Sequence, residues 1–213
     1  MKILTVSDKV EKSFFKEHLL REKCQGTHLI LACGDLPPYY LEYLVTSLNV
    51  PLYYVPGNHD EQPYQSYVTK SSFAKGCTNI DQSVIVFKNL IIGGLAGAFR
   101  YKKGKYLYTE TQMHRKVLSM IPRLLVNKIK YKRYIDILIT HAPPFGIHDE
   151  KDLPHRGFKE FLKFMKTYSP VYLIHGHTTP QAGKEITTSW YLSTRVINTN
   201  PYRLLEIDDA HIR

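Results

Sequence analysis

Short apolar runs alternate with amphipathic segments along most of the chain. The apolar runs predict strands at 2–7, 28–32, 52–55, 135–139 and 171–174. Segments with apolar residues at helical spacing predict helices at 11–23, 39–48, 110–131 and 158–168. Because strands and helices alternate and loops follow the strands, the pattern indicates an α/β fold with a parallel sheet.

Two further regions have their own patterns. The segments 84–87 and 90–93 predict a hairpin, and the runs 190–192, 195–198 and 203–207 predict antiparallel strands. The long helix is expected to carry five apolar residues on one side, namely Met113, Val117, Met120, Leu124 and Ile129. We expect the polar stretch 62–76 to form a mobile loop.

Composition narrows the class of protein. A length of 213 residues fits a single domain over 1–213, and 43% hydrophobic with 23% charged residues excludes wholesale disorder. The longest nearly apolar stretch, 90–99, is too short to cross a bilayer, so we expect no membrane partner. The first residues reach Ser7 and Asp8 too soon for a signal peptide, and the three cysteines lack paired spacing. These features predict a cytoplasmic protein with free thiols.

The positive charge is concentrated in one segment. Of 29 basic and 19 acidic residues, eleven basic and one acidic lie between Arg100 and Arg133, which leaves eighteen of each elsewhere. Five tyrosines are interleaved with or adjoin these cations, as on surfaces that follow a nucleic-acid backbone. A solvated helix face that keeps the protein soluble explains the same pattern. Under either interpretation the net charge of +10 favours an anionic substrate.

Residues that bind metals follow five of the predicted strands. They are Asp8, Asp35, the run Asn58-His59-Asp60, His141 and His177. Because ligands of open α/β sheets bind beyond the carboxyl ends of the strands, we expect these loops to converge on one pocket. Mixed oxygen and imidazole donors favour Mn, Fe or Zn over Ca.

The order of these motifs resembles that of the calcineurin-like metallophosphoesterases, whose motifs are D-x-H, G-D, G-N-H-D/E, a lone strand-end H and G-H-x-H. The matching segments are Asp8-Lys9-Val10, Gly34-Asp35, Gly57-Asn58-His59-Asp60, Thr140-His141 and Gly176-His177-Thr178-Thr179. The resemblance implies a four-layer α/β/β/α sandwich, with a metal centre at one edge of two stacked sheets.

Two positions depart from the family pattern. Val10 and Thr179 stand where the family has histidines that bind one metal. By the resemblance, the first metal site keeps only Asp8 and the bridging Asp35. The second site keeps its complete ligand set, which is Asp35, Asn58, His141 and His177.

The depleted first site leaves three outcomes open. A weakly held metal binds through Asp8, Asp35 and waters, or a cation such as Lys9 neutralises Asp8 in its absence. The third outcome is that catalysis has been lost and the pocket only binds a ligand.

Other residues receive roles near this site. The resemblance implies that His59 protonates the leaving oxygen, and Asp60 would then orient its imidazole. His175 is expected to make a hydrogen bond to one of the metal ligands, and direct ligation of the metal is the alternative. His155 and Arg156 lie in a polar segment that either lines the substrate side or is an ordinary surface loop.

These features predict a metal-dependent phosphoesterase, which hydrolyses a phosphodiester or a phosphomonoester with metal-activated water and one or two divalent ions. Mn, Fe and Zn are the candidate metals. The alternative is an inactive binding module on the same fold, with nucleic acid or another polyanion bound by the segment 100–133.

Overall fold

The computed structural model describes residues 1–60, 74–179 and 187–207. Most of the stretch 62–76, for which the sequence predicts a mobile loop, lies outside the described residues. The strands are β1 (Lys2–Val6), β2 (Thr27–Ala32), β3 (Leu52–Tyr54), β4 (Thr78–Asn79), β5 (Ser83–Phe87), β6 (Leu90–Leu95), β7 (Ala98–Phe99), β8 (Leu107–Tyr108), β9 (Ile137–Thr140), β10 (Tyr172–His175), β11 (Thr188–Tyr191), β12 (Thr194–Asn198) and β13 (Tyr202–Glu206). The helices are the 3-10 turn η1 (Lys12–Phe15), α1 (Glu17–Lys23), α2 (Pro38–Leu48), α3 (Glu110–Tyr131) and α4 (Lys159–Tyr168).

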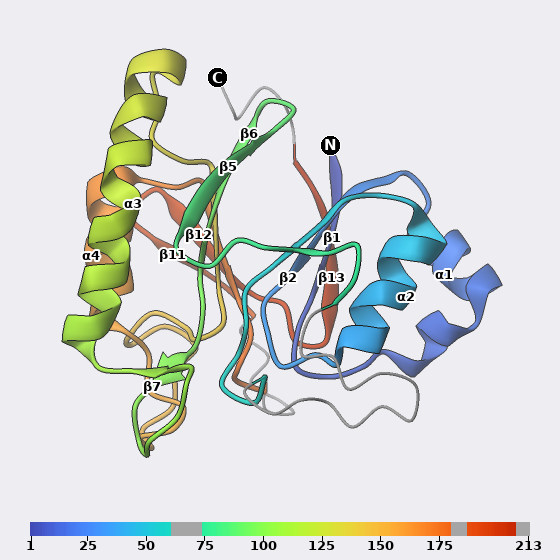
Figure 1. Ribbon diagram of the computed structural model, residues 1–213, viewed down its shortest axis with the longest axis horizontal. Coiled ribbons are helices and arrows are strands. Elements are labelled where there is room, and N and C mark those ends of the chain that lie inside the picture. Colours follow the sequence, from blue (N-terminus) through green and yellow to red (C-terminus); the bar gives the residue numbers. More distant parts are fainter. Residues whose placement is uncertain (61–73, 180–186, 208–213) are drawn as a thin grey trace.

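Two sheets stack face to face between two helical layers (Figure 1). The first sheet has the order β13-β1-β2-β3-β4, with β1 to β4 parallel and β13 antiparallel to β1. The second has the order β11-β12-β10-β9-β6-β5, with parallel central strands and antiparallel edges. Helices α1 and α2 cover the first sheet, and α3 and α4 cover the second (Figure 1). The α/β fold class and the four-layer sandwich are therefore confirmed.

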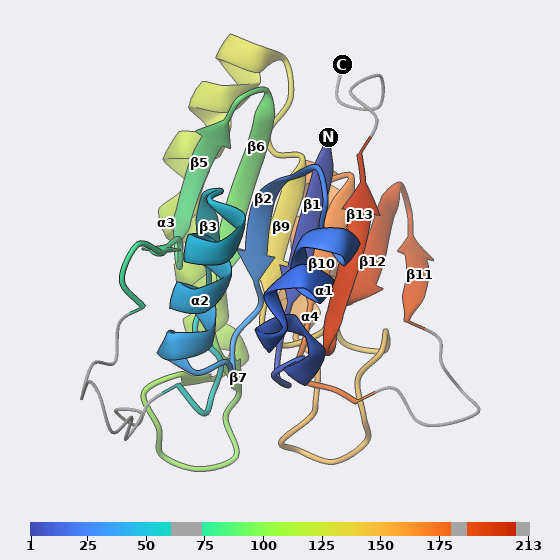
Figure 2. The ribbon, with the colours of Figure 1, turned by 90° about the vertical axis from the view of Figure 1, so that its right-hand side faces the viewer.

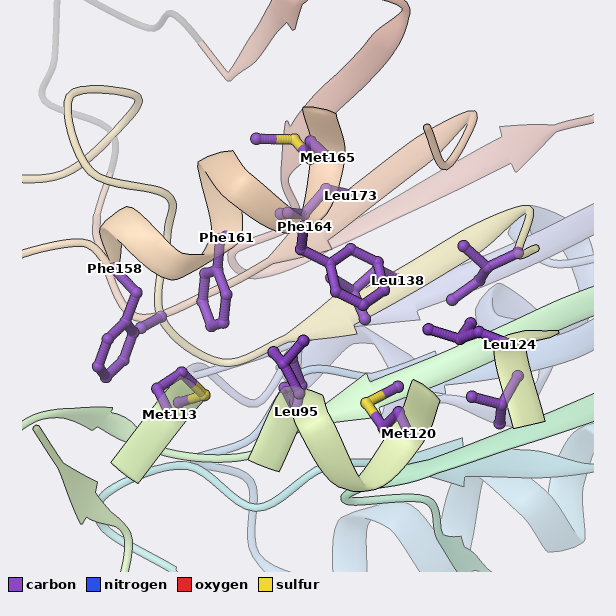
Figure 3. Packing of buried hydrophobic residues seen from close by; sticks show 14 of the residues in the cluster. Leu95, Met113, Met120, Leu124, Leu138, Phe158, Phe161, Phe164, Met165 and Leu173 are labelled. Carbon is purple, nitrogen blue, oxygen red and sulfur yellow. The ribbon is translucent and has the colours of Figure 1, made fainter. Parts of the chain in front are cut away.

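The central strands of both sheets run toward the same edge of the molecule, at the bottom of Figure 2. Apolar side chains fill the three interfaces between the layers. Between the second sheet and its helices, α3 contributes Met113 and Met120, and α4 contributes Phe161 and Phe164 (Figure 3). These interfaces fix the strands, and the strands fix the loops at the lower edge.

Three expectations from the sequence need correction. The predicted helix 11–23 is interrupted at Lys16, whose φ of −86° and ψ of 99° are extended, so η1 and α1 are separate. Ile129 is 76% exposed, away from the core side of α3. The last strand does not join its neighbours in a single antiparallel group, because β13 crosses over to pair with β1 in the first sheet.

The basic segment 100–133 is divided between interior and surface. Lys116 is buried, with Nζ 2.9 Å from Oδ1 of Asp81 and 4.0 Å from the centre of the Tyr108 ring. Arg133 binds Asp136, with 2.7 Å between Nε and Oδ1. Most of the other cations of the segment are exposed. Over residues 1–60, 74–179 and 187–207, no helix has the length and apolar composition needed to cross a bilayer.

Candidate metal centre

The loops that follow β1, β2, β3, β9 and β10 meet at one edge of the two sheets. They surround a cavity of about 560 Å³. Its lining includes the predicted site residues Asp8, Asp35, Asn58, His59, His155 and His177. Segments far apart in the sequence are thus brought together as the strand-end pattern predicts.

The predicted second-site ligands lie in mutual contact. Asp35, His141 and His177 each offer one ligand atom, and these atoms lie within 4.8 Å of one another. Nε2 of His141 lies 2.9 Å from Oδ1 of Asn58 and 3.3 Å from Oδ2 of Asp35. All four residues of the second set are therefore grouped around one point.

Hydrogen bonds to carbonyl oxygens fix which ring nitrogens face that point. Nδ1 of His141 lies 2.7 Å from the Cys33 carbonyl oxygen, so Nδ1–H donates and Nε2 faces the oxygens of Asp35 and Asn58. Nε2 of His177 lies 2.8 Å from the Pro154 carbonyl oxygen, which leaves Nδ1 as its ligand atom. Both rings are oriented as metal ligands usually are.

The donor set fits a divalent cation. Without a cation or a proton among them, the carboxylate, the amide oxygen and Nε2 of His141 would be three acceptors that face one another. Burial opposes the charged form of His141, but Asp35 and Asp8 outweigh burial and raise its pKa to about 9. Burial likewise opposes the charge of Asp35, yet His141 lowers the pKa of that carboxyl to about 2. A proton on His141 thus occupies the place that a cation can take.

Strained turns and close backbone contacts build the pocket. Asp8, Asp35 and His177 have left-handed φ values of 60°, 56° and 69°, which are uncommon for residues other than glycine. A Cβ at Gly57 would collide with the Asp35 carboxylate, and a Cβ at Gly176 would collide with Asp8 and Ser7. The glycines of these motifs are therefore required by the close approach of neighbouring loops.

The predicted first site has few donors. Oδ2 of Asp8 accepts the His177 amide at 2.9 Å, and burial raises the pKa of Asp8 even though His141 opposes it. Val10 packs against the apolar cluster beneath α1 and α2, and Thr179 is an exposed part of the cavity lining. Lys9 also lines the cavity and is exposed, and no ion pair in the described part of the chain joins it to Asp8.

His59 and Asp60 occupy different environments. His59 is exposed at the cavity, and its backbone amide donates to Oδ1 of Asp35 at 2.8 Å. Oδ2 of Asp60 accepts the amides of Asp35 at 2.9 Å and Gly57 at 2.8 Å. Burial, with a smaller effect of the Asp35 charge, raises the pKa of Asp60 to about 6. Asp60 thus joins two loops through their backbones, whereas the sequence predicts that it orients the His59 ring.

A hydrogen-bonded series of polar side chains, of which His175 is buried and His148 and Ser189 are partly buried, supports the loop after β10. Ser189 Oγ lies 2.8 Å from Nε2 of His148, and Nδ1 of His148 lies 2.9 Å from Nε2 of His175. Nδ1 of His175 in turn lies 2.9 Å from the Gly176 carbonyl oxygen. Because the carbonyl can only accept, His175 donates to it, His148 donates to His175, and Ser189 donates to His148. Burial lowers the pKa of His148 to about 4 and that of His175 to about 3, so both rings are neutral.

The hydrogen bond from His148 gives His175 a partner that the sequence does not reveal. The sequence predicts a hydrogen bond from His175, but the role of His148 depends on the left-handed turn at its φ of 60°. No spacing rule connects His148 to Ser189.

The two remaining predicted residues differ in position. His155 lines the cavity, its ring lies 5.1 Å from that of His177, and its Nδ1 lies 2.7 Å from Oδ2 of Asp152. The guanidinium of Arg156 lies 5.6 Å from the ring centres of Phe99 and Phe145. Tyr101, from the basic segment, also lines the cavity, although no sequence pattern predicts it there.

Comparisons with known proteins identify both a family and a fold. A family model described as calcineurin-like phosphoesterase matches residues 1–181. The crystal structure of TT1561 of Thermus thermophilus aligns with a TM-score of 0.60 and 16% identity, over 92% of this chain and 88% of that chain. Another crystal structure gives a TM-score of 0.63 and 12% identity, over 96% and 94%.

A Vps29 single mutant from Entamoeba histolytica gives a TM-score of 0.47 and 16% identity, over 98% and 87%. At 12% and 16% identity, the two structures with TM-scores of 0.63 and 0.60 are informative about the fold alone. No curated protein sequence matches the chain.

Proposed function

The chain belongs to the calcineurin-like phosphoesterase family, and on that premise we propose that it hydrolyses phosphoesters with a divalent cation bound at the second site. The observation that carries this proposal is the convergence of Asp35, Asn58, His141 and His177 on one point beside an open cavity. The substrate class is a soluble phosphomonoester or phosphodiester, and Mn, Fe and Zn are the candidate ions.

The groups around that point have different roles in the proposed hydrolysis. A bound divalent ion supplies positive charge that activates water and stabilises the charge of a phosphoryl transition state. The carbonyls of Cys33 and Pro154 hold His141 and His177 in the ligand orientation. His59, exposed at the cavity, protonates the leaving oxygen.

The first site is proposed to hold a second ion weakly. Asp8 and Asp35 are the two carboxylates available there, and Val10 and Thr179 supply no imidazole. A single firmly bound ion per chain is therefore expected, and the metal content of protein purified without chelator measures it.

Turnover by matched variants tests the proposal. Protein loaded with Mn²⁺ should hydrolyse p-nitrophenyl phosphate or its bis-ester, and Asn58→Ala and His141→Ala should abolish that activity. His18→Ala, which removes an exposed imidazole on α1, is the matched control and should keep the parent rate. Equal rates in the parent and both ligand variants, or no turnover with any of the three metals, would reject hydrolysis at this site.

A second candidate is a binding module that has lost catalysis. The loss of both first-site histidines, at Val10 and Thr179, favours it. This candidate predicts one bound ion per chain, no turnover with any metal, and binding of a phosphate-bearing ligand that Asn58→Ala weakens.

A further inference from the structure

Helix α3 has two apolar faces, and only one of them is in the core. Its inner face carries Met113, Met120 and Leu124, all buried against the second sheet and α4 (Figure 3). Its outer face carries Leu118, Leu125, Val126 and Ile129, which are 46%, 49%, 49% and 76% exposed. These positions and the exposed Pro122 follow helical spacing, so they form one continuous stripe opposite the core.

Cations flank the stripe on both sides. At about 100° per residue, Arg123 and Lys130 lie along one side of it and Lys128 along the other, and all three are exposed. Long basic side chains in this position can lie along an apolar surface while their charged ends reach out of it.

The neighbouring helix extends this positive surface. Helices α3 and α4 together form the outer layer on this side of the molecule (Figure 1). Lys159, Lys163 and Lys166 are exposed on α4 at spacings of four and three residues, so they form one row.

The acidic residues of the two helices offset only a small part of this charge. Each helix has a single acid, Glu110 in α3 and Glu160 in α4. Glu110 accepts the backbone amides of Lys159 at 2.9 Å and Glu160 at 3.2 Å. Glu160 is buried, lies 2.8 Å from Nδ1 of His114 and pairs with Nζ of Lys163 at 3.2 Å, so it offsets one lysine of the row on α4. The outer layer is therefore an apolar stripe within a broad basic surface.

We propose that the outer face of α3 and α4 binds the surface of an anionic lipid bilayer. Apolar side chains of such a face enter the boundary between headgroups and acyl chains, and the flanking cations contact anionic headgroups. This inference does not depend on the proposed hydrolysis. It replaces the expectation of no membrane partner, which rested on the lack of a spanning segment.

Other occupants fit less well. A second copy of the chain would bring two basic faces together, which like-charge repulsion opposes. Nucleic acid would match the cations but would place phosphates against the apolar stripe. A single acidic helix would cover the stripe on α3 and leave the lysine row of α4 without a counterpart. A flat anionic surface matches both helices.

Co-sedimentation of the full chain with lipid vesicles tests the proposal. We expect binding to mixed phosphatidylglycerol–phosphatidylcholine vesicles, none to pure phosphatidylcholine, and weaker binding as salt rises. The double variant Leu125→Ser/Ile129→Ser should lower the partition coefficient roughly tenfold, since it removes exposed apolar area that would enter the bilayer. Lys130→Gln/Lys166→Gln should lower it by roughly tenfold or more.

Matched variants elsewhere on the surface serve as controls. Leu192→Ser makes the same chemical change at a leucine that is 67% exposed, beyond the end of β11. Lys12→Gln/Lys16→Gln removes two exposed cations from the opposite helical layer. Both controls should bind vesicles as the parent does, and circular dichroism checks that every variant is folded.

Three results of the vesicle assay would each overturn the proposal. They are no binding to the anionic vesicles, equal binding to neutral vesicles, and equal loss of binding in the control variants. A dimer in size-exclusion chromatography that Ile129→Ser dissociates would instead assign the face to a contact between copies. Tighter binding to an acidic helical peptide or a DNA duplex than to the vesicles would also contradict it.

Discussion

The backbone amide of His177 donates a 2.9 Å hydrogen bond to Oδ2 of Asp8. The bond joins the loop after β1 to the loop after β10, and both residues lie in left-handed turns. Asp8 therefore holds the His177 backbone in place as well as facing the cavity.

Substitution of Asp8 should separate these two roles. Asp8→Ala removes the acceptor, and we expect the free energy of unfolding of the metal-free protein to fall by about 1–3 kcal/mol. Asp8→Asn keeps an oxygen that can accept the amide, so its loss should be smaller. Urea unfolding measures both variants, and equal losses would show that the hydrogen bond to His177 contributes nothing.

Cation binding should become stronger as pH rises. In the metal-free protein the pKa of His141 is raised to about 9, because Asp35 and Asp8 outweigh the opposing effect of burial. Below that pH a cation must displace a proton, so its apparent affinity should rise about tenfold per pH unit. Calorimetry in two buffers of different ionisation enthalpy should count about one released proton at neutral pH.

The raised pKa of His141 also makes the stability of the metal-free protein depend on pH. Stability should fall as pH rises, whereas the affinity for a cation should increase. Because the folded-state pKa of His141 lies above its ordinary value, protonated His141 stabilises the folded state. That stabilisation is complete below the ordinary pKa of about 6.5 and is lost as pH rises through about 9. His141→Gln should remove this dependence, and an unchanged pH profile in that variant would contradict the assignment.

Gly57→Ala should disable the metal centre while the fold is retained. The added methyl would collide with the carboxylate and the backbone nitrogen of Asp35, so it would move the carboxylate away from His141 and also cost some stability. We expect Mn²⁺ affinity to fall by roughly 10- to 100-fold, as when a group that positions a metal ligand is lost. Gly26→Ala is the control: it has no neighbour within 4 Å at a φ of 76°, so it should cost stability but not affinity. A Gly57→Ala protein with parent affinity would contradict the structure.

The buried pair of Lys116 and Asp81 should be sensitive to the loss of either partner. Burial lowers the pKa of Lys116, although the Asp81 charge opposes this effect, and Oδ1 of Asp81 also accepts the Ala96 amide at 2.7 Å. Lys116→Met should cost up to about 3 kcal/mol of unfolding free energy, since it leaves the largely buried Asp81 carboxylate without its cation. The double variant Lys116→Met/Asp81→Asn should recover part of that cost.

An exposed lysine of the basic segment 100–133 provides the control for Lys116→Met. Lys103→Met removes an exposed charge, so the unfolding free energy should change by less than about 0.5 kcal/mol. Denaturant melts of the parent, the two single variants and the double variant complete the double-mutant cycle, and additive effects of the two single changes would show that Lys116 and Asp81 do not interact.

The sequence predicts the order of elements and the convergence of strand-end residues, because both follow from short-range patterns. Alternating strands and helices require a parallel sheet, and parallel strands carry their C-terminal loops to one edge. Asp35, His141 and His177 meet there for that reason.

The sequence-based predictions are wrong where one hydrophobic pattern is compatible with two arrangements of the side chains. Ile129 continues the helical periodicity of α3, but the stripe on the outer face has the same periodicity, and only the neighbouring sheet decides between them. Side-chain partners that are far apart in the sequence also cannot be predicted from it. Asp60 stands in the G-N-H-D motif, but the motif does not show that its side chain binds the amide of Asp35, and no spacing rule pairs His148 with Ser189.

Strand β1 lies between β2, to which a short connection leads, and β13, which is far away in the sequence. Until Tyr202–Glu206 pairs with β1, the amide of Ser7 lacks the carbonyl of Pro201, and β1 is an open edge that other chains can pair with. Completion of the strand that carries Asp8 at its end therefore depends on a contact of long sequence separation, so a variant that weakens β13 should expose this edge to aggregation.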